Sequence, residues 1–133
     1  MINIEAEVFS PIYDAVTTAY PTAFVTSEYV RDPASFPHVS IVETDNYMTP
    51  GRLDTSDFER YSTITYEINV YSNKTSGKKS ECRDIMMMID RMMYDHNFVR
   101  LSMTPVPNLE DATIYRIVAR YRAETDGARL YRP

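Results

Sequence analysis

Residues 61–73, YSTITYEINVYSN, alternate between apolar and polar side chains in the clearest strand pattern of the chain. The apolar members fall on one side of an extended strand: Ile64, Tyr66, Ile68 and Val70. The residues between them are mostly polar. A strand of this kind buries one face in a core and leaves the other face in water. The pattern therefore predicts a sheet with a single core face.

The expected pairing partner of this strand is ATIYRIVARYRAE, residues 112–124, which alternates in the same way. Its polar side carries a row of arginines: Arg116, Arg120 and Arg122. A cross-strand ion pair between Glu67 and one of them would stabilise the sheet by less than about 1 kcal/mol. The row is open to two interpretations, a nucleic-acid contact or a solvated face balanced by carboxylates. The formal net charge of -5 favours the second.

Residues 80–98, SECRDIMMMIDRMMYDHNF, hold five of the eight methionines of the chain. At about 100° per residue, the apolar side chains form a helical stripe about 120° wide. Its members are Cys82, Ile85, Met86, Ile89, Met92 and Met93. Cys82 and His96 would lie about 21 Å apart along the axis, too far to share a metal ion or to form a nucleophilic pair. The segment is therefore predicted to be a helix packed on the sheet, with Cys82 an inert, at least half-buried thiol.

Two features of this helix do not fit simple packing. Met87 and Tyr94 fall together on the side opposite the apolar stripe, where they are either ordinary exposed residues or part of a partner surface. Lys78 and Lys79 stand at the predicted helix start, where the helix dipole disfavours positive charge. They are either screened by solvent or faced by carboxylates of a neighbouring subunit.

The remaining elements complete a small domain. Residues 4–19 have helical periodicity, and Pro11 leaves two possibilities: the helix is kinked there, or it begins at Ser10. Strands are expected in the segments AFVTSEYV, HVSIVE and FVRLSMTPVPN, with a possible edge strand in ARLYRP. Residues 1–133 are predicted to form one α/β (α+β) domain. It should have a small mixed, mainly antiparallel sheet of four to six strands and two helices on one face.

A long connection is expected at residues 44–58, TDNYMTPGRLDTSDF, because Pro, Gly and repeated Asp occur there without a period. It is either a flexible hairpin tip or an arm that packs on a partner. Apolar side chains within it favour the arm: Tyr47, Met48, Leu53 and Phe58.

No catalytic or cofactor pattern is recognisable. The single cysteine excludes an internal disulfide, and His38 has no second histidine at metal-ligand spacing. The segment TSGKKS lacks the upstream glycine of a phosphate-binding loop. Neither a targeting segment nor a membrane span is expected. These residues leave an α/β enzyme with an unrecognised site open. Only the resemblance to a known family, carried by the strings that follow, implies a protein with no enzymatic role and no cofactor.

Three strings carry a resemblance to a known family. They are FPHVSIVETDNY, then TYEINVYSNKTSGKKSECRDIMMMIDRMM, then NFVRLSMTPVPNLEDATIYRIVARYRA, and the likeness covers roughly residues 8–131. The chain resembles the tail terminator family of long-tailed bacteriophages. The resemblance implies a virion protein of the tail and neck, assembled in the host cytoplasm as a homo-oligomeric ring, usually of about six copies. Its partners would be the tail tube protein and the head connector or stopper protein.

The resemblance hands over no binding residues, so the candidate interface rests on the features above: Tyr47, Met48, Leu53, Phe58, Lys78, Lys79, Met87, Tyr94, Arg116, Arg120 and Arg122. Non-specific contact of the arginines with passing DNA is a further expectation. The alternatives are another head-tail joining neck protein, or a small ligand- or nucleic-acid-binding module that uses the wet sheet face.

Overall fold

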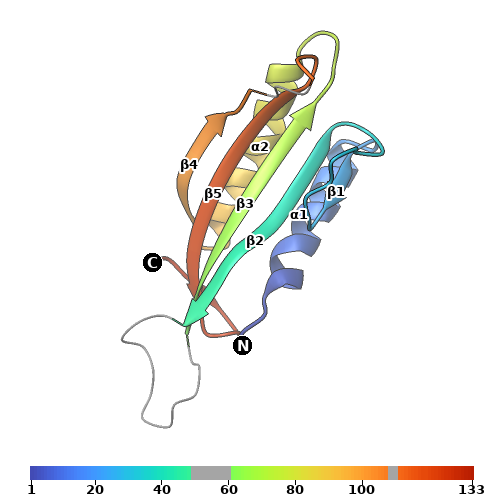
Figure 1. The fold of residues 1–133 in the computed structure, drawn as a ribbon. Coiled ribbons are helices and arrows are strands. Elements are labelled where there is room, and N and C mark those ends of the chain that lie inside the picture. The colour runs from blue at the N-terminus through green and yellow to red at the C-terminus, as the bar shows by residue number, and fades with distance from the viewer. Residues whose placement is uncertain (49–60, 108–110) are drawn as a thin grey trace, which may run out of the picture.

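The computed structural model describes residues 1–48, 61–107 and 111–133, and within them the chain forms two helices and six strands. In chain order these are α1 (Glu5–Ala19), β1 (Phe24–Thr26), β2 (His38–Met48), β3 (Ser62–Ser72), α2 (Lys78–Asp95), β4 (Val99–Pro105), β5 (Tyr115–Thr125) and β6 (Leu130–Tyr131). The sheet follows the order β1-β2-β3-β5-β4, with β6 pairing beside β5 (Figure 1). All neighbours are antiparallel except β1 and β2.

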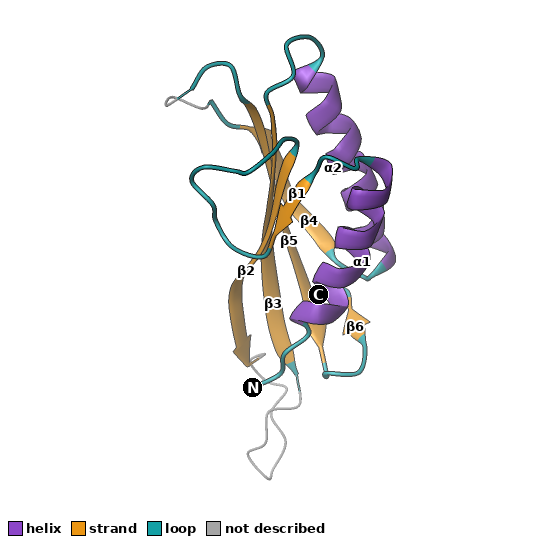
Figure 2. Cartoon of the chain, turned by 90° about the vertical axis from the view of Figure 1, so that its right-hand side faces the viewer, coloured by secondary structure: helices purple, strands orange, loops and turns teal. Residues whose placement is uncertain are grey.

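Both helices lie on one face of the sheet, and the connection between β1 and β2 lies on the other (Figure 2). This arrangement is the predicted mixed, mainly antiparallel α+β fold. The core fills the space between helices and sheet. Its largest fully buried side chains come from both helices, from β2, β3 and β5, and from the short link between α2 and β4, and include Ile12, Ile41, Tyr66, Ile89 and Phe98.

The predicted pairing of β3 with β5 is confirmed over the whole of both strands, from Ser62 opposite Thr125 to Ser72 opposite Tyr115. The apolar side of β3 is fully buried, as its alternation predicted. The expectation that the other side is wet is only partly right. Asn69 on that side is fully buried because Arg116 of the neighbouring strand reaches across it.

The helix α2 confirms the predicted stripe, since Cys82, Ile85, Met86, Ile89 and Met93 are buried. It begins at Lys78, after Gly77 with a φ of 82°. This left-handed backbone conformation suits glycine, which has no Cβ to clash. The helix ends where Asn97 takes a φ of 67° and the Phe98 amide donates to the Met93 carbonyl. Such a left-handed residue after the last turn is a common helix stop.

The helix α1 answers the question that its proline left open. It continues through Pro11, so a start at Ser10 is wrong. Proline at this position removes one amide donor from the helix ladder. The helix persists because its stripe is buried on both sides of Pro11, with Val8 before it and Ile12 and Val16 after it. The Asn3 side chain accepts a hydrogen bond of 3.1 Å from the Glu5 amide at its start.

The predicted loop at residues 44–58 is wrong at its beginning. Residues 44–48 continue β2 and pair with β3 as far as Met48 opposite Ser62. The polar sequence TDN predicts a turn, but pairing with β3 prevails, and a bulge between Glu43 and Asp45 absorbs the irregularity. The rest of that loop prediction, including Leu53 and Phe58, lies outside the described residues. The strand predicted in AFVTSEYV shortens to β1.

Two fully buried tyrosines on the core face provide a test of the packing. The Tyr121 hydroxyl donates a 2.8 Å hydrogen bond to Asp90, whereas no described residue partners the Tyr66 hydroxyl. We expect Tyr121→Phe to lower the free energy of unfolding by about 1.5–3 kcal/mol, because it breaks a hydrogen bond to a charged group. Tyr66→Phe should change it by less than about 0.5 kcal/mol or stabilise slightly. Urea denaturation of both variants measures this, and equal losses would contradict the assignment.

Candidate assembly surfaces

The sheet face opposite the helices is the outer face, and its part over β2 and β3 is covered by the connection of residues 27–37 (Figure 2). The hydroxyl of Tyr29 in this connection donates to the Glu67 carboxylate on β3. Burial and this hydrogen bond raise the pKa of Tyr29 to about 12. The connection is therefore tied to β3 at the centre of the sheet, and it withdraws the surface beneath it from possible partners.

A row of stacked side chains crosses the outer face from strand to strand. Phe24 of β1 stacks on His38 of β2, with ring centroids 5.3 Å apart, and His38 stacks on Tyr71 of β3 at 5.2 Å. The guanidinium of Arg116 on β5 lies 5.4 Å from the Tyr71 ring centroid. The register places these four residues directly opposite one another. This ladder joins four strands at one level, and the sequence showed none of it.

His38 is held in one tautomer within this ladder. The Thr26 hydroxyl donates to the Glu28 carbonyl at 2.8 Å, so its oxygen accepts from His38 Nε2–H at 3.2 Å. The other ring nitrogen, Nδ1, is buried and has no hydrogen-bond partner among the described residues. Burial lowers the pKa of His38, because a charged imidazole here would lose its hydration without gaining a counter-charge.

This histidine predicts a dependence of stability on pH. Because the pKa is lower in the folded than in the unfolded protein, the unfolded state binds more protons as pH falls through the unfolded value of about 6.5. The stability of the wild type relative to His38→Phe, which keeps the stack but cannot titrate, should therefore decrease from pH 7.5 to pH 5. Urea denaturation at several pH values measures the difference. If the free energies of unfolding of the two proteins changed equally with pH, His38 would not be the source of the pH dependence.

The three arginines of the row differ in whether they bind to other side chains of the sheet. Arg116 donates to Asn69 Oδ1 through Nε at 3.0 Å and Nη2 at 2.8 Å. Arg120 forms the predicted ion pair with Glu67, at 2.8 Å. Arg122 is exposed and forms no ion pair with a described residue. Two of the three predicted interface arginines therefore serve the sheet itself, and Arg122 remains for a partner or for DNA.

The outward side of α2 carries the predicted exposed pair. Met87 is 67% exposed and Tyr94 is 58% exposed, so both side chains leave apolar surface in water. The Tyr94 ring also receives the C-terminal Arg132, whose guanidinium lies 4.3 Å from the ring centroid. Arg132 further donates to the Tyr94 carbonyl at 3.3 Å. Only the fold brings these residues together, because 38 positions separate them.

The predicted lysine pair at the start of α2 has different surroundings at its two positions. Lys79 is exposed, whereas Lys78 is half-buried beside a groove of about 500 Å³ lined by Pro105, Val106 and Tyr115. The carboxylate of Asp111 is close enough for Lys78 to contribute to its lowered pKa, after hydrogen bonds from Thr113. The positive charge of Lys78, which was expected to be screened by solvent or faced by a neighbouring subunit, is thus partly offset by Asp111 of the same chain.

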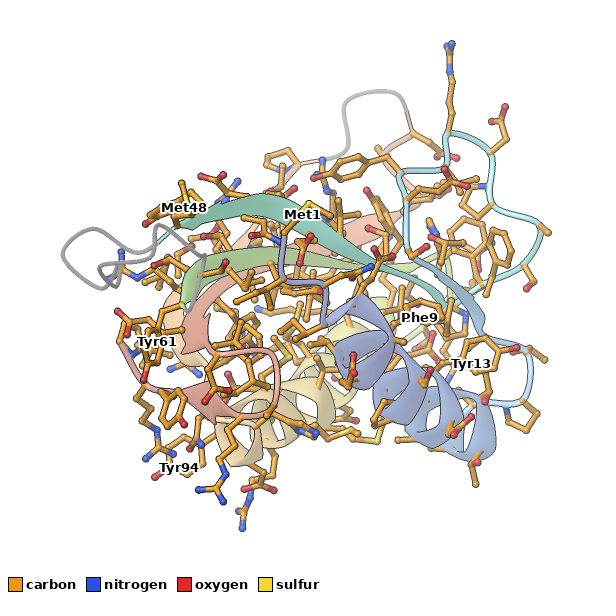
Figure 3. The ribbon with its side chains drawn as sticks, turned by 90° about the horizontal axis from the view of Figure 1, so that it is seen from below. Met1, Phe9, Tyr13, Met48, Tyr61 and Tyr94 are labelled. Atoms are coloured by element: carbon orange, nitrogen blue, oxygen red, sulfur yellow. The ribbon has the colours of Figure 1, made fainter. Side chains whose placement is uncertain are left out.

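The two described candidates of the predicted arm lie at the end of β2. Tyr47 is 40% exposed and Met48 is 52% exposed, and both belong to a strand instead of a loop. Met48 lies at the opposite end of the molecule from Phe9 and Tyr13 in Figure 3. Apolar surface therefore extends to this end of the sheet, although through a different structure from the one predicted.

The chemistry of a reactive site is not assembled at Cys82. The thiol is fully buried and contacts the carbonyls of Val70 and Tyr115 at 3.6 and 3.5 Å. Burial raises its pKa to about 12, so it is almost wholly protonated near neutral pH. The predicted burial of this thiol is confirmed. Among the described residues, no group of three His, Cys, Asp or Glu side chains is placed to hold a metal ion.

Neither the protein-family models nor the curated proteins compared with this chain match it. Neither described helix combines the length and apolar character needed to cross a membrane.

Proposed function

We propose that this protein is a structural virion protein, a ring-forming tail terminator that caps the tail tube and joins it to the head connector. The observation that carries the proposal is the placement of the resembling strings. They fold into one continuous unit in which β3 pairs with β5 along its length and α2 packs on both strands. The likeness thus covers the centre of the domain and is not scattered over its periphery.

The distribution of exposed apolar side chains supports the same function. Met87 and Tyr94 lie on the helix side, Tyr47 and Met48 at one end of the sheet, and Leu101 on an edge strand. A ring subunit needs several partner surfaces, because two faces meet its neighbours and two meet the layers above and below. On this proposal the protein has no catalytic role and needs no cofactor, and its partners are its own copies, the tail tube protein and the head connector.

The proposal is tested by purified protein and tubes assembled from the cognate tail tube protein. Light scattering over a wide concentration range should give either a closed ring of about six copies or a monomer that is captured at tube ends. Electron microscopy should show density at one end of each tube and no further elongation. A strict monomer that leaves tube length unchanged and does not sediment with tubes would contradict the function.

A matched pair of variants separates a partner surface from a general effect of added charge. Met87→Asp places a carboxylate on the outward side of α2, and Tyr13→Asp does the same at an exposed aromatic residue of α1. We expect Met87→Asp to fold normally and to weaken binding to tubes or to other copies about tenfold, because a charge in a buried contact loses its hydration. Tyr13→Asp should bind as the wild type does. Equal behaviour of the two variants would remove Met87 from the interface.

A further inference from the structure

The charge of this chain is divided between the two sides of its sheet. Residues 1–48 contain seven carboxylates and one arginine, a formal charge of −6. Residues 61–133 contain nine carboxylates and eleven lysines and arginines, a formal charge of +2. The strand order places β1 and β2 toward one edge of the sheet and β5 and β4 toward the other, with α1 on the acidic side (Figure 1). These two parts of the chain therefore make the β1–β2 side of the sheet acidic and the β5–β4 side weakly basic.

The basic edge comprises Tyr94, Val99, Arg100, Leu101, Arg122 and Arg132. No described strand pairs with the outer side of β4, and the exposed fractions of Val99 and Leu101 are 37% and 48%. A groove of about 520 Å³ runs between α2 and this strand. Its lining includes Arg132, Tyr94 and Val99, together with Arg100, whose charge is paired with Asp90 of the same groove at 3.0 Å. Arg132 and Arg122 are therefore the positive charges that this edge offers to a partner. Apolar surface with a charged rim on an unpaired strand is typical of a surface that meets another chain.

The acidic edge comprises Glu5, Glu7, Glu43, Asp45, Tyr47 and Met48. Here β1 pairs only with His38–Ser40, so the rest of that side of β2, residues 41–48, has no partner strand among the described residues. This free part is similar in length to β4, which has seven residues. A groove of about 470 Å³ on α1 is lined by Glu5, Glu7 and Phe9, together with Ser27 after β1.

The carboxylates of this edge are crowded. Burial raises the pKa of Glu43, and the negative charge of Glu5 raises it further. Glu43 lies opposite Tyr66 in the sheet. The pKa of Tyr66 is raised first by burial and then by the charges of Glu43, Glu5 and Glu7. No basic residue lies in α1 to balance them. Arginines from another chain would relieve this repulsion.

We propose that the basic edge of one copy docks on the acidic edge of the next, with β4 beside the free part of β2. The occupant of each edge is thus a second copy of this chain in a head-to-tail contact. The inference rests on the proposed ring function, since a heterologous contact that repeats with a closing rotation produces a ring. It adds which two surfaces form that contact, and it explains why both edges are unpaired and oppositely charged.

Charge reversal tests this docking. Arg122→Glu with Arg132→Glu makes both edges acidic, and Glu7→Lys with Asp45→Lys makes both edges basic. Each double variant alone should associate at least about tenfold more weakly than the wild type, because like charges would face each other. An equimolar mixture of the two variants should associate again, since complementary edges then alternate around the ring. Light scattering and sedimentation measure the masses.

A third variant, Arg31→Glu with Arg83→Glu, makes the same change of net charge at two exposed positions outside both edges and should associate as the wild type does. Thermal unfolding of every variant checks that it is folded. The wild-type association should also weaken with added salt.

The outcomes distinguish the two proposals. If the wild type forms rings or caps tubes but the reversals have no effect, or the mixture fails to restore association, the docking is wrong and the ring function stands. If the mixture restores association but no assembly binds tubes, the docking holds and the terminator function is wrong. A wild type that stays monomeric both alone and with tubes overturns both.

Discussion

The pairing of β3 with β5 is the constraint on which the rest of the structure depends. These two strands form the middle of the sheet, and their ladder is continuous from Ser62 to Ser72. The chain between them must cross from one strand to the other, and it does so through α2 and β4. Because one side of both strands is apolar, α2 has to cover that side, and its methionine-rich stripe fits the twisted surface.

The outer face follows a different rule, because polar groups that lose water need partners. Arg116 donates two hydrogen bonds to the side-chain oxygen of Asn69, and its guanidinium stacks on the Tyr71 ring. The Tyr71 ring in turn stacks on His38. The short β1 and the connection after it close this row from the other side. Among the described residues, the outer face therefore carries an ordered row of side chains around His38 and Tyr71, whereas Arg122 of β5 and Val99 of β4 stay exposed.

The division of charge between the two edges gives the molecule a direction. A single copy gains nothing from exposed apolar groups on an unpaired strand, since such edges invite uncontrolled association. A head-to-tail contact would bury the exposed apolar groups and pair the free strand edges in one step. The arginines of one copy would then meet the carboxylates of the next, and β4 would lie beside the free part of β2. The same surfaces that are costly in isolation would then limit assembly to one orientation, which is what a closed ring of this kind requires.

The candidate surfaces were found from the sequence only in part. The exposed positions of Met87 and Tyr94 follow from helical periodicity, and both are exposed in the structure. The arginine row also follows from alternation, but alternation says only which side a residue faces. The partners of Arg116 and Arg120 lie on β3, 47 and 53 positions away along the chain. No local pattern can show such pairings, so two arginines nominated for an interface belong to the fold.

The sequence by itself determined the elements whose patterns are strong and local. These are the alternating strands β3 and β5, the stripe of α2 with its buried Cys82, and the α+β class with both helices on one face. Only the tertiary structure decided the rest: the extension of β2 to Met48, the persistence of α1 through Pro11, and the stacked ladder around His38. In each of these cases contacts with a distant part of the chain outweigh a local preference for a turn, a helix break or exposure. The edges were likewise invisible in the sequence, because strand order, and with it the side on which each charge lies, is set by which strands pair.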